Sequence, residues 1–362
     1  MFVGWRDLRF AKGRFALMGS VIVLITLLVG LLSGLTAGLG RQNTSAITDL
    51  PVDRIAFQRP AHGRSPSYSD STVTERQWRQ WSAAAGVDSA EPLGITTTRA
   101  TAGGESAVVS AFGVQPGSRL PPDGGDVGSG TAVLSTGAAA DLGVEAGDVL
   151  TLAGQRLHVA AVRGDASFSH TPVIWVSLDV WRKTAPRTVP GAGPTATVIA
   201  LDTGSETDVA AVDRRARTTT LSTAGSLSAI GSYSAENGSL QLMRGFLFAI
   251  SALVVGAFFS IWTIQRSGDV AVLKALGASQ ACLLKDALGQ AAVLLVAGTA
   301  LGTGAAVALG ALAAGSAVPF LLTPATALFP AAVMILLGTL GAALAVRRIT
   351  SVDPLTALGS VR

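Results

Sequence analysis

Four side chains near residue 240 have the types and the spacing of a ligand site. Tyr233, Glu236, Leu240 and Met243 follow one another at intervals of three, four and three residues, which places them on one face of a helix. Phenol and thioether groups are known ligands of heme iron, whereas a carboxylate is an unusual one. A carboxylate next to an apolar segment is costly unless it is paired or functional. The pattern predicts a ligand site; alternatively, Glu236 stays in headgroup water while Leu240 and Met243 only pack.

Helix geometry limits this site. Glu236 and Met243 are two turns apart, about 10 Å along a helix, so a single straight helix cannot offer both as axial ligands to one iron. A two-fold axis would remove the difficulty, because equivalent residues of two protomers would face one ligand. Arg41 and Arg244 border two apolar segments and are further candidates, since they would neutralise acidic groups of the ligand; snorkelling explains both equally well.

The elements that position these residues are apolar. The chain is 49% hydrophobic and 14% charged, against about 25% charged in soluble domains, which argues against a soluble enzyme, a nucleic-acid binder or a disordered protein. Uncharged runs are long enough to cross a bilayer, and prolines divide the longest of them. The sequence predicts four transmembrane helices, at 15–40, 245–265, 287–314 and 326–346.

Charge predicts the orientation of these helices. Residues 41–244 carry 17 basic and 19 acidic side chains, whereas the rest of the chain carries 10 basic and 4 acidic ones. By the positive-inside rule, both termini are cytoplasmic, the protein lies in the plasma membrane, and 41–244 is extracytoplasmic. The remaining segments are an interfacial amphipathic helix, a cytoplasmic loop, an outer loop and a cytoplasmic tail, at 1–14, 266–286, 315–325 and 347–362.

The segment 41–244 has the pattern of an α+β domain that ends in a helical stalk. β-branched and apolar runs separated by glycines predict strands at 131–134, 149–152, 157–162, 173–176 and 197–201. Helices are predicted at 75–85 and 206–218, and an exposed loop at 115–127. The predicted fold is therefore an α-helical membrane protein with a large α+β extracytoplasmic domain between its first two spans.

Small residues recur every four positions on two predicted spans, at Gly30, Gly34 and Gly38 and at Gly298 and Gly302. This spacing lets two helices approach closely. Packing within one chain and packing in a homodimer both explain it.

Several kinds of chemistry are missing from the sequence. It contains no G-x-x-x-x-G-K-[ST] phosphate loop, no Cys/His cluster and a single cysteine, Cys282. His158 alternates with apolar residues in a predicted strand, which favours a structural role. We therefore expect no enzyme activity in this chain, no intrinsic cofactor and no metal other than the iron of a bound heme.

Two cytoplasmic segments and one outer segment resemble the FtsX/MacB-like permeases of ABC transporters. They read R-S-G-D-V-A-V-L-K-A-L-G-A-S from Arg266, R-R-I-T-S-V-D-P-L-T-A-L from Arg347, and T-A-V-L-S-T-G-A-A-A-D-L-G-V-E-A-G-D-V-L-T-L from Thr131. The four-span order with one large outer domain is similar as well. Within this family, the size and layout look most like the permeases of heme exporters.

The resemblance implies a transport subunit that works as a dimer with two copies of a separate ATPase, which would hydrolyse the ATP. A short helix would couple the ATPase to the spans through Asp269, Val270, Leu273, Leu276 and Gly277, with Asp269 at its start and Gly277 as its C-terminal stop. The expected function is export of heme taken laterally from membrane lipid. The alternatives are a signalling permease that regulates a cell-wall hydrolase, or an exporter of a peptide, antibiotic or lipid.

Overall fold

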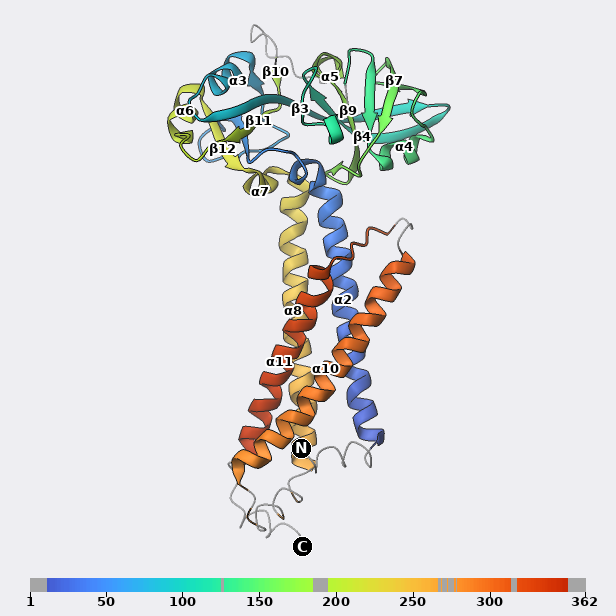
Figure 1. Cartoon of the computed structure of the whole chain (residues 1–362), viewed down its shortest axis with the longest axis vertical. Coiled ribbons are helices and arrows are strands. Elements are labelled where there is room, and N and C mark those ends of the chain that lie inside the picture. The colour runs from blue at the N-terminus through green and yellow to red at the C-terminus, as the bar shows by residue number, and fades with distance from the viewer. Residues whose placement is uncertain are drawn as a thin grey trace. The chain divides into compact units, whose positions relative to one another are not determined.

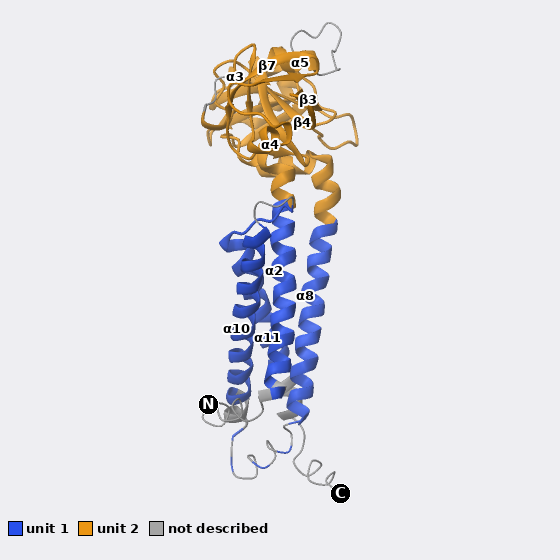
Figure 2. Cartoon of the chain, turned by 90° about the vertical axis from the view of Figure 1, so that its right-hand side faces the viewer, with its two compact units in different colours: residues 1–38, 239–362 blue, residues 39–238 orange. Residues whose placement is uncertain are grey.

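The computed structural model describes residues 12–124, 127–184, 195–265, 279–313 and 318–350, together with Gly268, Val272 and Gly277. The chain divides into two compact units (Figure 2). We call residues 1–38 and 239–362 the membrane unit, and residues 39–238 the inserted domain. Most of the predicted interfacial helix at 1–14, most of the loop after residue 265 and the end of the predicted tail lie outside the described residues.

Four helices are long and apolar enough to cross a membrane, as predicted (Figure 1). They are α2 (Lys12–Thr48), α8 (Gly231–Gln265), α10 (Gln280–Ala313) and α11 (Pro324–Thr350). The first two extend beyond the uncharged runs, so that the end of α2 and the start of α8 belong to the inserted domain. The polar residues 41–48 and 231–244 therefore continue helices that begin or end in the apolar segments.

Within the membrane unit, the glycine stripes pack against neighbours of the same chain. A Cβ on Gly302 of α10 would lie 2.6 Å from the backbone oxygen of Val23 in α2. The backbone N–H of Leu321 donates to the carbonyl of Gly34 at 3.1 Å. The other close approaches are Gly30 to Ala306, Gly34 to Phe320, Gly38 to Pro319 and Gly298 to Ile22. The five predicted packing glycines thus all contact residues of this chain.

Few side chains of the membrane unit are buried. Its core joins Phe15, Met18 and Ile22 of α2 to Val255, Phe259 and Trp262 of α8, with Ala291, Leu295 and Ala342 from the other two helices. Large apolar side chains such as Leu253 and Leu301 remain 72% and 67% exposed. This distribution suits helices whose outer surfaces face lipid.

The inserted domain is built on a ten-stranded sheet of order β12-β1-β11-β3-β4-β9-β5-β7-β6, with β8 paired to β9. Its strands are β1 (Arg54–Gln58), β3 (Val87–Ala102), β4 (Glu105–Val114), β5 (Thr131–Leu134), β6 (Val149–Leu152), β7 (Gln155–Val162), β8 (Ser167–Phe168), β9 (Thr171–Ser177), β11 (Val198–Thr203) and β12 (Thr218–Ser222). A second, two-stranded sheet joins β2 (Val73–Thr74) to β10 (Thr195–Ala196). The helices are α3 (Glu75–Ser82), α4 (Thr136–Leu142), α5 (Leu178–Thr184), α6 (Val209–Ala216) and α7 (Thr223–Ser226), with 3₁₀ turns at Pro122–Gly124 and Leu227–Ala229.

The long strand β3 changes partners halfway along its length. Residues 87–93 pair with β11, and residues 94–102 pair with β4. Near its end, β3 also pairs with β6, Ala100 opposite Leu152. Six strands, β3-β4-β9-β5-β7-β6, therefore close into a ring beside the β11-β1-β12 part of the sheet.

The predicted strands at 131–134 and 149–152 match β5 and β6 residue for residue, and the other three agree within a few residues with β7, β9 and β11. Both predicted helices exist but are shorter, as α3 and α6. The prediction of an exposed loop at 115–127 is wrong in part. Leu120 and Val127 are only 3% and 2% exposed, because both join the core of the domain.

Candidate ligand-binding site

A tight turn between β8 and β9 carries the first residue of the site. Phe168 pairs with Thr171, so the hairpin turns on Ser169 and His170 alone. Both have positive φ, 51° and 63°, as a two-residue hairpin turn requires, although glycine and asparagine are the usual residues there. The end of α2 holds this conformation, since the N–H groups of Ser169 and His170 donate to the carbonyls of Asn43 and Gln42 at 3.0 and 3.2 Å.

Aromatic packing fixes the strand before this turn. The ring of Phe168 contacts Tyr68 and Phe112 edge-to-face, at centroid distances of 5.5 and 5.7 Å. Ser45 of α2 holds the same strand, because its Oγ accepts a hydrogen bond from the N–H of Ser167 at 2.8 Å. His170 is therefore placed by a rigid hairpin, which is the kind of support that a binding residue needs.

The turn brings His170 against Glu236, which lies in the first turns of α8. The Nε2 atom of His170 is 2.9 and 3.1 Å from the two carboxylate oxygens of Glu236. The buried Asn43 contacts both residues: its Nδ2 lies 3.1 Å from His170 Nε2 and 3.4 Å from Glu236 Oε2. Ser232 completes the group, donating to Asn43 Oδ1 at 2.6 Å and pairing with Ser169 at 2.8 Å.

The site remains accessible from solvent. The side chains of His170 and Glu236 are 29% and 44% exposed, whereas Asn43 is 2% exposed. An imidazole and a carboxylate, both of them potential metal ligands, thus lie next to each other. Among the described residues, no group of three or more His, Cys, Asp or Glu side chains is placed to hold a metal ion by itself.

Arg41, a candidate from the sequence, is already neutralised. Its guanidinium lies 2.8 Å from Asp165 and 3.1 Å from Asp49. The hydrogen bond from Arg41 holds the pKa of Asp165 below its ordinary value. Arg41 therefore ties the end of α2 to the strand connection at residue 165 and has less charge to offer a ligand.

The other sequence candidates lie on α8 without such a cluster. Tyr233 is half-buried and packs against the core of the inserted domain. Leu240 and Met243 follow in the membrane unit, where Met243 is 56% exposed. Arg244 stacks on the ring of Phe329, 5.5 Å from its centroid. The structure thus brings Glu236 together with His170, a residue that sequence reasoning missed, and leaves Met243 farther along the same helix.

The predicted ATPase-coupling residues Asp269, Val270, Leu273 and Leu276 lie outside the described residues. Gly277 is described, and its φ of 95° lies in the region that favours glycine at the end of a helix.

Family models match most of the chain. The MacB-like periplasmic core domain matches residues 15–219, and the FtsX-like permease C-terminal model matches residues 242–354. The chain therefore belongs to the FtsX/MacB-like permeases of ABC transporters. Such a permease works with an ATPase subunit, and this sequence has no phosphate loop of its own.

Curated relatives match along the whole chain. A protein of Staphylococcus haemolyticus, whose name describes it as HrtB, the permease of a hemin transport system, is 22% identical over 100% of both chains. A protein of the same name from Staphylococcus epidermidis is 23% identical over 99% of both chains. Among solved structures, the periplasmic region of MacB from Actinobacillus actinomycetemcomitans matches 49% of this chain and 92% of its own, with 11% identity and a TM-score of 0.35.

Proposed function

We propose that this chain is the membrane subunit of a dimeric ABC exporter, that a separate ATPase drives it, and that its substrate is heme taken laterally from the membrane. Two facts support heme in particular. The full-length relatives are named for hemin transport, and Glu236 at the start of α8 is hydrogen-bonded to His170 of the β8–β9 turn. The His170–Glu236 contact is the main support for the proposal, because it concerns potential ligand atoms of this chain itself.

The His170–Glu236 pair solves the problem that one helix alone cannot supply two ligands to the same iron. Met243 lies two turns from Glu236, too far to share one iron on a straight helix. His170 reaches Glu236 from a different element and supplies an imidazole, the commonest protein ligand of heme iron. Leu240 and Met243 follow in the membrane unit and stay predictions from the sequence. Arg244, which forms no ion pair with a described residue, is the better candidate for a propionate than the doubly paired Arg41.

Heme titration of the purified full chain tests this assignment. His170→Ala and Glu236→Gln should each weaken binding about tenfold or more and shift the Soret band, since the first removes the imidazole and the second removes the negative charge of the carboxylate. Met243→Ala should weaken binding less and leave the band in place. His158→Ala is the matched control, because His158 is also an exposed histidine of the inserted domain, in β7. Unchanged affinity and spectrum in the first two variants would refute the heme site.

ATP hydrolysis by the complex with its ATPase separates substrate binding from assembly. Glu236→Gln should remove stimulation by heme and keep basal hydrolysis, because the loop after α8 is untouched. Loss of basal hydrolysis in this variant would show that Glu236 supports assembly instead.

The proposed orientation places the inserted domain outside the cell and both termini in the cytoplasm. A cysteine introduced at Gly124 should react with an impermeant thiol reagent on intact cells, and native Cys282 should not. The reverse labelling pattern would invert the orientation and exclude a ligand site on the outer side.

A further inference from the structure

The inserted domain contains a pocket that the heme proposal does not use. Its volume is about 420 Å³, within the usual range of small-molecule sites. It lies where β3 leaves β11 and begins to pair with β4, and the segment 68–72 forms another wall. It touches the His170–Glu236 cluster only through Ser169 and Ser232 and includes neither His170 nor Glu236.

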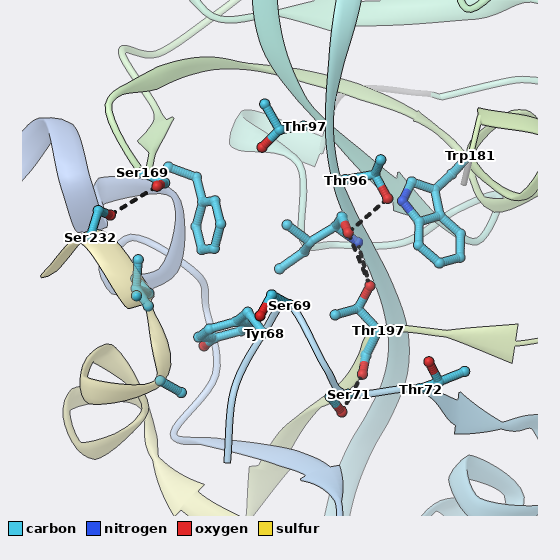
Figure 3. Close-up of a pocket in the computed structure, with 15 residues that line it drawn as sticks. Tyr68, Ser69, Ser71, Thr72, Thr96, Thr97, Ser169, Trp181, Thr197 and Ser232 are labelled. Atoms are coloured by element: carbon cyan, nitrogen blue, oxygen red, sulfur yellow. Dashed lines mark hydrogen bonds between the residues drawn. The ribbon is translucent and has the colours of Figure 1, made fainter. Parts of the chain in front are cut away.

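The lining is uncharged and rich in hydroxyl groups. None of the described residues that line it is Asp, Glu, Lys, Arg or His. A charged ligand would lose its hydration there without gaining a counter-charge, so the pocket suits a neutral one. Aromatic rings of Phe168 and Trp181 provide apolar surface. The hydroxyl groups come from several elements (Figure 3) and belong to Tyr68, Ser69, Ser71, Thr72, Thr96, Thr97, Ser169, Thr197 and Ser232.

The indole N–H of Trp181 has no acceptor in the described part of the chain. Its side chain lies flat on β3 and β4, because Gly94 and Gly113 stand opposite each other there and leave room for the indole. Trp181 is 6% exposed, and its Nε1 has no hydrogen-bond partner among the described residues. In Figure 3 this nitrogen lies on the side of the ring that faces Thr96 and the pocket. The buried Trp81 donates to Thr218 at 3.1 Å, whereas the Nε1 of Trp175, which does not line this pocket, likewise has no partner among the described residues.

Two hydroxyls of the lining are also available. Those of Thr72 and Thr97 make no hydrogen bond to any described residue, whereas those of Ser71 and Thr197 are used within the fold. A hydroxyl both donates and accepts, so Thr72 and Thr97 match ligand groups that do the same. Together with the indole N–H of Trp181, these two hydroxyls give the pocket three groups that can form hydrogen bonds with a ligand.

We propose that this pocket binds a neutral sugar ring. Sugar hydroxyls both donate and accept, and the C–H faces of the ring pack on aromatic surfaces such as those of Trp181 and Phe168. The ring carries no charge, as the lining requires. Heme does not fit this chemistry, because its propionates are acidic and none of the described lining residues is basic. The phenol of Tyr68 is already hydrogen-bonded to Ser226 at 2.9 Å. The sugar site is therefore independent of the proposed heme transport.

The probe is N-acetylglucosamine or maltose, titrated onto the full chain in phospholipid nanodiscs and followed by saturation-transfer NMR. Maltoside detergents are avoided, since their headgroups would compete. Glucosamine is the matched ligand control, because it keeps the ring and adds a positive charge. The neutral sugars should bind at least tenfold tighter than glucosamine. Nanodiscs with and without a neutral diglucosyl lipid show whether the sugar ligand is a lipid headgroup or a free sugar. If the lipid competes with the soluble sugar, the ligand is a glycolipid headgroup.

Variants locate the binding. Trp181→Phe removes the donor and keeps an aromatic ring, although a smaller one than the indole, and Thr97→Val removes a hydroxyl without changing shape. Each should weaken binding about fivefold, the effect of one hydrogen bond. Thr98→Val, the next residue on β3 and not part of the lining, should leave binding unchanged. Thermal melting of each variant confirms folding. No binding of neutral sugars by the wild type, equal loss in Thr98→Val, or binding of tetra-alanine in place of sugars would overturn the proposal.

Discussion

The Nε2 atom of His170 lies 2.9 Å from a carboxylate oxygen of Glu236, although 66 residues separate them in the sequence. Three elements meet to make this contact: the β8–β9 turn, the end of α2 and the start of α8. The contact depends on two consecutive non-glycine residues with positive φ, a conformation that costs energy at each residue. Such strain in a native fold is typical of functional sites, and it can be tested directly.

Replacing His170 by glycine should separate stability from binding. His170→Gly relieves the positive φ and should leave the inserted domain about 1 kcal/mol more stable than His170→Ala, which keeps the strain and also loses the imidazole. Neither variant should bind heme like the wild type. Chemical denaturation followed by circular dichroism measures the difference. Ala153→Gly, at a φ of 47° in the β6–β7 turn, is the control: it should gain similar stability without any effect on heme. Equal stability of His170→Gly and His170→Ala would show that the turn is unstrained.

The pair could not be found from the sequence, because nothing in the spacing of His170 and Glu236 indicates that β8 approaches α8. The helix face that carries Glu236 could be predicted, since helical periodicity depends only on residues close together in the sequence. The strands at 131–134 and 149–152 were visible for the same reason: short apolar runs between glycines. The β3–β4 hairpin was missed because β3 contains Pro92 and a run of threonines. Its two-residue turn, Gly103 and Gly104 with φ of 55° and 100°, was a recognisable signal.

The ion pair between Arg41 and Asp165 predicts a dependence of stability on pH. Arg41 lowers the pKa of Asp165 in the folded state, so the pair stabilises the fold above the unfolded pKa of about 3.9. This contribution disappears as the pH falls through the folded pKa. Because Asp165 is 63% exposed, the effect is small, below about 1 kcal/mol.

Asp165→Asn should therefore lower the melting temperature by up to about 3 °C at pH 7 and by progressively less below pH 4. Asp141→Asn, at an exposed position in α4, should have no effect at either pH. A difference for Asp165→Asn that is as large at pH 3 as at pH 7 would mean that packing, and not charge, explains it.

Packing of α10 on α2 should be sensitive to one methyl group. A Cβ on Gly302 would lie 2.6 Å from the backbone oxygen of Val23 and 2.8 Å from Thr26 Cβ, whereas a Cβ on Gly304 would meet nothing within 4 Å. Gly302→Ala should therefore destabilise the membrane unit by about 1–3 kcal/mol, and Gly304→Ala should be neutral. Thermal aggregation in detergent compares the two. If the two variants melt together, the α2–α10 contact does not limit stability.

The conformation of Gly277 leads to a prediction about coupling. Its φ of 95° is one that a residue with a Cβ rarely adopts, and a Cβ there would meet no atom of a described residue within 4 Å. Gly277→Ala should therefore act through the backbone alone. Because we expect the segment around Gly277 to contact the ATPase, this variant should reduce ATPase co-purification and heme-stimulated hydrolysis several-fold, while heme binding at the proposed His170–Glu236 site stays normal. Gly268→Ala is the matched control, since Gly268 has equal space and no positive φ. Equal loss in both variants would point to a general effect on the segment, and full activity of Gly277→Ala would show that the turn at Gly277 plays no part in coupling.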